Sequence, residues 1–95
     1  MDARELTLNI AVNLGRIGRW ACEGRMNRMH LFLAETEAYI SQLEQAKKSP
    51  RFCRTFDAFR KSFDELKSET HIDAMWAEMM FTWANILTHR ASRAG

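Results

Sequence analysis

The sequence holds few residues that break helices, with one proline and four glycines among 95 residues. These residues do not separate short runs of alternating polar and apolar side chains, so no β-sheet is expected. The glycines follow no predicted strand, which argues against a glycine-rich phosphate-binding loop. Cys22 and Cys53 lack the spacing of metal ligands, and we expect free thiols in a cytoplasmic protein.

Long hydrophobic runs and an excess of one charge are also missing. Apolar runs such as 31–34 are too short to span a membrane, and the N-terminus lacks the basic and apolar segments of a signal peptide. The net charge is only +2, from 14 basic and 12 acidic residues. This balance is compatible with nucleic-acid binding but does not indicate it.

Apolar residues nevertheless make up 46% of the chain, and they recur with helical spacing. The clearest stripe advances in steps of four and three residues: Phe52, Phe56, Phe59, Phe63 and Leu66. A helix with such a stripe must bury it against other helices. We therefore predict a single all-α domain over residues 1–95.

Comparable stripes predict four helices, at about 3–22, 26–47, 50–67 and 71–90. Helices of this length joined by short turns favour an antiparallel up-down four-helix bundle. We expect three helices to begin at capping residues, with a proline at the first position of the third helix. These residues are Asp2, Ser49 with Pro50, and Thr70.

The fourth helix carries a broad apolar edge that we expect to face the core. Its members are Ile72, Met75, Trp76, Met79, Met80, Trp83, Ile86 and Leu87. Its methionines would serve as core filler or, alternatively, as an adaptable binding surface. Phe81 is expected to point away from this edge, and residues 91–95 are expected to fray.

Gly24 is the predicted break between the first two helices, because their apolar stripes are out of phase with each other. A heptad pattern also continues across this position. One helix over 3–47 is therefore an alternative, and it would give an extended or domain-swapped dimer.

The first predicted helix is unusual in having small residues on one strip and apolar residues on a second side. Either a large aromatic side chain of the same chain or a second chain packs into the strip. The second apolar side favours a partner, and we expect a homo-oligomer through this helix. The predicted partner-binding residues are Leu8, Ala11, Val12, Gly15 and Gly18.

Four arginines surround the predicted break: Arg16, Arg19, Arg25 and Arg28. Trp20 lies among them, and arginines interleaved with aromatic rings are suited to phosphate contact and base stacking. A turn at the break would spread these arginines in several directions and allow them to pair with acidic residues. Nucleic-acid binding is therefore the alternative function.

Arg25 and His30 have the spacing Arg-x4-His. These six residues resemble the ribonuclease motif of the HEPN family of small helical bundles. The resemblance implies that Arg25 and His30 would act on an RNA 2′-hydroxyl and phosphate, paired across a dimer. Met26 replaces the polar residue that often follows the family's arginine.

His30, Glu37 and Glu44 recur at steps of seven, which suggests a metal site on one edge of a helix. Di-iron bundles, however, use Glu-x-x-His on two helices, and no histidine here has that spacing. We therefore expect no metal, no cofactor and no catalytic residues. The favoured function is a non-enzymatic scaffold or interaction module that binds an unidentified protein partner.

Overall fold

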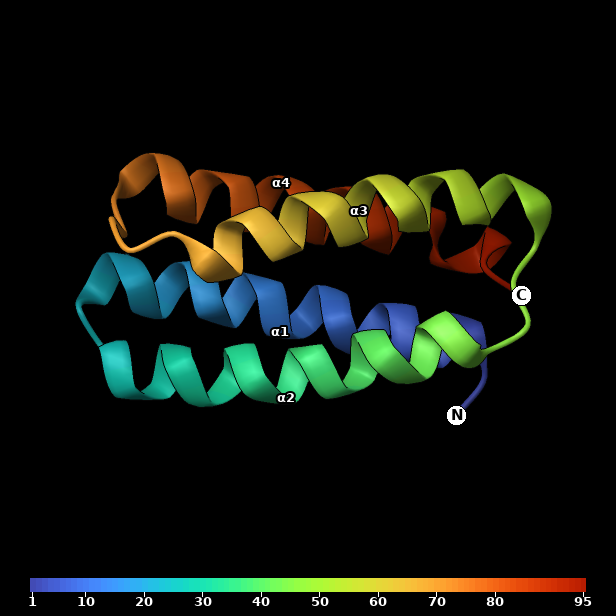
Figure 1. Ribbon diagram of the computed structural model, residues 1–95, viewed down its shortest axis with the longest axis horizontal. Helices are drawn as coiled ribbons and strands as arrows, with labels where there is room; N and C mark the ends of the chain where they lie inside the picture. Colours follow the sequence, from blue (N-terminus) through green and yellow to red (C-terminus); the bar gives the residue numbers. More distant parts are fainter.

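The computed structural model describes residues 1–95 and contains four α-helices and no strand. The elements are α1 (Ala3–Glu23), α2 (Met26–Gln45), α3 (Pro50–Ser68), α4 (Ala74–Arg90) and a 3₁₀ turn, η1 (Ala91–Arg93). The helices run alternately up and down, and both termini lie at the end where α2 connects to α3 (Figure 1). The all-α four-helix bundle is confirmed, and no helix is long and apolar enough to cross a membrane.

Polar side chains cap three of the helices, as local sequence dictates. Asp2 Oδ1 accepts a hydrogen bond from Glu5 N at 2.8 Å, and Ser49 Oγ accepts one from Phe52 N at 3.2 Å. The predicted cap of the fourth helix was wrong. Asp73, not Thr70, caps α4, because its carboxylate accepts the Trp76 N–H at 2.9 Å and the helix begins only at Ala74.

Gly24 ends α1 in the left-handed conformation, with φ 75° and ψ 16°. Its N–H and that of Arg25 donate to carbonyl groups of the last turn, those of Ala21 and Trp20. This is the common glycine termination of a helix. The alternative of one helix over 3–47 is therefore wrong, because a left-handed residue turns the chain back on itself.

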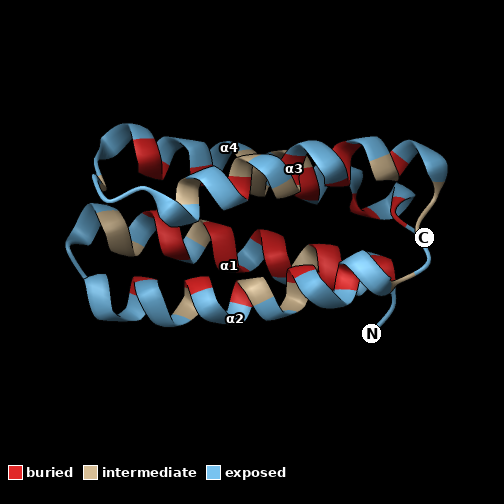
Figure 2. Ribbon diagram, viewed as in Figure 1, coloured by how far each residue is buried: buried red, intermediate tan, exposed pale blue.

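The centre of the core is α1, whose main apolar edge is fully covered. This helix packs closely on α2 and α4, whereas α3 approaches α4 at only a few positions. The four phenylalanines of the α3 stripe are at most 3% exposed, and buried residues line the inner sides of the helices (Figure 2). Because α3 approaches α4 at only a few positions, hollows remain on the outer side along the seam between these two helices.

The predicted core edge of α4 is wrong at Met75 and Met79, which are 77% and 39% exposed. Phe81 is 36% exposed, as expected for a residue away from that edge, and one side of its ring also lies against α1. A Cβ built on Gly18 would come within 2.6 Å of that ring. The edge of α4 that faces inward includes Ala77, a small buried residue that periodicity of the large side chains overlooks.

The C-terminal residues dock on the bundle instead of fraying. Ala91 and Ala94 are buried at 2% and 0% exposure. Ser49 holds this segment, because its hydroxyl donates to the carbonyl of Arg93 and its backbone N–H donates to that of Ala94 at 3.0 Å. Residues 91–95 were expected to fray because they end the chain. Two buried methyl groups and two hydrogen bonds hold this segment on the bundle instead.

The carboxylate of Glu37 connects α2 to α3. It accepts hydrogen bonds from Arg60 and Lys67, and both contacts are ion pairs. Burial by itself would raise the pKa of Glu37. The hydrogen bonds and positive charges of Lys67 and Arg60 outweigh this effect, so the pKa of Glu37 lies below its ordinary value.

We expect Glu37 to make the stability of the bundle depend on pH. Its pKa is lower in the folded than in the unfolded protein, so its contribution is fully present above the ordinary value near 4.5. The contribution is lost as the pH falls through the folded pKa. Glu37→Gln should lower the free energy of unfolding at neutral pH by about 1 kcal/mol and should cost progressively less in acid.

Urea unfolding of the wild type and the variant over a range of pH measures this difference. Glu78→Gln is the matched control, because Glu78 is an exposed glutamate of α4 that forms no ion pair. A penalty for Glu37→Gln that stays constant from neutral pH into acid would contradict the expectation.

Candidate functional site

Two separate hollows lie one after the other on the outer side between α3 and α4. The first, of about 490 Å³, lies beside Arg51 and Arg90, and the second, of about 370 Å³, lies beside the loop that joins the two helices. Between them the indole N–H of Trp83 donates to Ser62 Oγ at 2.8 Å, across the seam. We call the two hollows together the α3–α4 groove.

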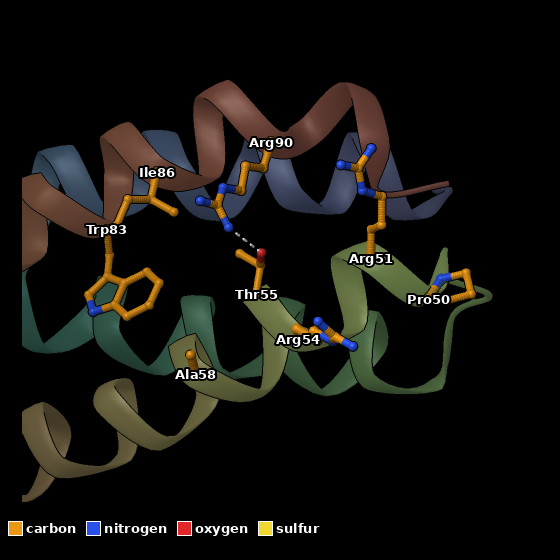
Figure 3. Close-up of a pocket in the computed structure, with 8 residues that line it drawn as sticks. All are labelled: Pro50, Arg51, Arg54, Thr55, Ala58, Trp83, Ile86 and Arg90. Atoms are coloured by element: carbon orange, nitrogen blue, oxygen red, sulfur yellow. Dashed lines mark hydrogen bonds between the residues drawn. The ribbon is translucent and has the colours of Figure 1, made fainter.

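One end of the groove is basic. Arg51 and Arg54 from the start of α3 and Arg90 from the end of α4 line the larger hollow (Figure 3). Arg93 lines a smaller hollow beside it together with Arg51 and Arg90. None of these four arginines forms an ion pair, and only Arg90 has a side-chain partner, donating to Thr55 Oγ1 at 2.7 Å. The basic end therefore presents four positive charges that no carboxylate of the chain neutralises.

The middle of the groove is apolar, and its side chains pack against the buried core. Trp83 and Ile86 line it from α4, and Ala58 faces them from α3 (Figure 3). The ring of Trp83 lies 5.4 Å from that of the buried Phe59, centroid to centroid. With its N–H bound to Ser62, the indole is held in place as a fixed aromatic surface.

The other end of the groove is acidic and carries exposed methionine. Glu65, Glu69 and Asp73 line the second hollow together with Met75 and Met79. The carboxylate of Glu65 has no partner within the chain, whereas those of Glu69 and Asp73 also hold the connecting loop. Flexible methionine side chains beside carboxylates form an adaptable surface that suits an apolar partner with positive charge.

The charges of α3 are arranged against its helix dipole. Its first turn has no acidic residue and contains Arg51, with Arg54 in the next turn. Glu65 lies near its other end and Glu69 is the C-cap residue, where Lys67 is the only basic residue. Helices are stabilised by the opposite order, with anions at the N-terminus and cations at the C-terminus, by a few tenths of a kcal/mol or more per charge. Local helix stability therefore does not explain this arrangement.

The predicted partner-binding strip of α1 is partly covered within the chain. Ala11 and Gly18 are buried, and the ring of Phe81 lies against Gly18. Val12 is 53% exposed, and Leu8 and Gly15 are half-buried. An aromatic side chain of the same chain thus fills part of the strip, and partner binding by the remaining outer side of α1 stays a prediction.

The predicted arginine cluster near the α1–α2 turn is exposed, but its aromatic rings are already engaged. Trp20 and Phe32 pack edge to face with their centroids 4.7 Å apart. Arg16 lies over the ring of Phe32 at 6.0 Å, and Arg28 lies over that of Trp20 at 5.8 Å. Because these cation–π contacts occupy the ring faces, the cluster offers positive charge without a free platform for base stacking.

Arg25, the first residue of the HEPN-like motif, precedes α2 and forms an exposed ion pair with Glu23 at 3.3 Å. His30 is exposed on the second turn of α2. No group of three or more His, Cys, Asp or Glu side chains gathers in a way that could hold a metal ion. Glu37 and Glu44, which share a helix edge with His30, both pair with Arg60.

Comparisons with models of protein families, with curated proteins and with solved structures found no match to this chain. The case for a function therefore depends on the geometry and charge of the α3–α4 groove.

The basic end of the groove was not predicted from the sequence, although a signal for it was present. Arg51 and Arg54 lie in the first turns of the third helix, Arg90 ends the fourth, and Arg93 follows three residues later. In an antiparallel bundle the start of one helix lies beside the end of the next. The two pairs of arginines are therefore brought together by topology.

Proposed function

We propose that the protein is a small non-enzymatic interaction module that binds a protein partner in the α3–α4 groove. The observation that supports this proposal is the order of surfaces along the groove, which is basic at one end, apolar in the middle and acidic at the other. A protein segment complements all three surfaces when it carries apolar residues between an acidic and a basic end.

Other ligand classes match the groove less well. The phosphates of a nucleic acid would be attracted to Arg51 and Arg54 but repelled by Glu65 and Glu69 further along the same groove. The two hydroxyl side chains that line the groove, those of Thr55 and Ser62, accept hydrogen bonds from Arg90 and Trp83. A catalytic nucleophile would instead be bonded to a base that removes its proton.

A cytoplasmic location is part of the proposal. Cys22 and Cys53 are both free thiols, and Cys22 is exposed. Free cysteines are typical of reducing compartments, where disulfides are rare.

Capture of the partner by the tagged full-length chain, from a lysate of the cells that produce it, tests the proposal. The groove variant combines Arg54→Glu with Met75→Lys, both at exposed positions. Val12→Glu alters the exposed side of α1 and serves as the control for the alternative surface. We expect the groove variant to capture at least about tenfold less partner, because Glu at position 54 repels the partner's acidic end and Lys at position 75 repels its basic end.

The Val12→Glu variant should capture as much partner as the wild type, and nuclease treatment should have no effect. Capture that is lost with Val12→Glu but kept by the groove variant would place the site on α1 instead. Capture that disappears with nuclease would favour nucleic-acid binding over the proposed protein partner.

A further inference from the structure

We infer that the occupant of the α3–α4 groove is a second copy of the same chain, bound antiparallel across a twofold axis. This inference rests on the proposed function, in which the groove is a protein-binding surface, and it names the partner. Twofold interfaces join the same patch on both subunits, so the patch must be complementary to itself.

The groove meets this requirement by its order of charges. On α3, Arg54 and Glu65 are eleven residues apart, which is about 16 Å along the helix. Trp83 and Ser62 bridge the seam between the two charged ends. A twofold axis near this bridge, in the plane of the interface and perpendicular to the helices, places the basic end of each copy on the acidic end of the other. The apolar middle parts of the two grooves then pack against each other.

The pairing also accounts for the unusual charge order of α3. Arg51 and Arg54 stand at the end of the helix where its dipole disfavours cations, and they form no ion pair within the chain. In the twofold arrangement they face Glu65 and Glu69 of the second copy. Charges that destabilise α3 within one chain thus form attractive contacts between two chains.

The size of the face is sufficient for a specific but reversible dimer. The bundle measures 36 × 21 × 20 Å, so one long side projects to about 700 Å² per copy. Stable specific interfaces bury about 800 Å² per partner, weak transient ones bury less than about 600 Å², and obligate dimers bury about 1,000 Å² or more. We therefore expect dissociation in the micromolar range rather than an obligate dimer.

Sedimentation velocity of the purified full-length chain, from about 1 to 200 μM, tests this inference. One variant carries Arg51→Glu and Arg54→Glu, and the other carries Glu65→Lys and Glu69→Lys. Each variant gives α3 the charge order that its dipole prefers, and Glu69→Lys removes only one exposed hydrogen bond, from His71 N. Both variants should therefore stay folded, which circular dichroism checks. We expect each variant alone to self-associate at least about tenfold more weakly than the wild type.

The decisive measurement mixes the two variants in equal amounts. One variant then carries acidic residues at both ends of its α3 and the other carries basic residues at both ends. We therefore expect the mixture to form a heterodimer at the strength of the wild-type dimer. Arg4→Glu with Arg19→Glu makes the same change of net charge as the arginine variant, at exposed positions of α1, and should leave the dimer intact.

A wild-type chain that remains monomeric over this concentration range would overturn the inference, as would a mixture that fails to associate. If partner capture from lysate still depends on the groove in that case, the proposed function stands and only the identity of the occupant is wrong. If the groove variant captures as much partner as the wild type, both the proposed function and the proposed dimer are wrong.

Discussion

Phe59→Ala is expected to lower the free energy of unfolding by about 4 kcal/mol, because it removes a ring from the centre of the core. Phe59 is 1% exposed, and its ring lies 5.7 Å from that of Phe63 and 5.4 Å from that of Trp83. A domain of this size has only about 5 to 15 kcal/mol of stability in total. The variant should therefore be close to unfolding at physiological temperature, as measured by urea unfolding followed by circular dichroism.

Phe81→Ala provides the matched control, since it removes the same ring from a position on α4 that is 36% exposed. It should cost less than half as much, because part of that ring already contacts water. Equal losses at the two positions would contradict the packing described for α3. Partial unfolding of Phe59→Ala should also free the indole of Trp83 and weaken any binding in the α3–α4 groove.

The second large effect concerns two glycines of α1 that are expected to respond in opposite directions. Gly18→Leu should destabilise the bundle by about 2 kcal/mol, because a Cβ at this position would come within 2.6 Å of the Phe81 ring. Gly15→Ala should instead stabilise it by up to about 1 kcal/mol, because a Cβ there meets no atom within 4 Å and alanine favours the helix. Thermal and urea unfolding of both variants measures the two changes.

A double-mutant cycle separates this contact from a general effect of the larger side chain. Adding Phe81→Ala to Gly18→Leu should recover part of the loss, since the space left by the ring accommodates the leucine. Strictly additive losses would show that Phe81 is not what opposes a side chain at Gly18. A Gly15→Ala variant that is less stable than the wild type would point to a second chain packed against α1, the interface predicted from the sequence.

The helix ends that could be predicted are those set by local chemistry. Asp2 and Ser49 cap α1 and α3, and Gly24 takes the left-handed conformation that few other residues adopt. Each of these interactions spans three or four residues of the chain. The cap of α4 was misplaced by three residues, because Thr70 and Asp73 are both suitable capping residues and the length of the α3–α4 connection chooses between them.

The buried face of a helix could be predicted when large apolar residues occupied only one side. The stripe of α3 is such a case, and its four phenylalanines are buried. In α4 apolar residues surround most of the helix, so periodicity does not choose a face. Close packing against α1 favours the side that contains Ala77, which rotates Met75 and Met79 outward into the groove.

The sequence by itself determined that this protein is four helices with a turn at Gly24 and a phenylalanine core from α3, because capping and amphipathic periodicity act over a few residues. Only the tertiary structure decided where the α3–α4 groove lies and which charges line it. Arg54 and Arg90 are far apart in the chain and become neighbours only because α3 and α4 are antiparallel. Contacts between distant residues depend on how closely each pair of helices packs, and that spacing is set by all the side chains of the core together.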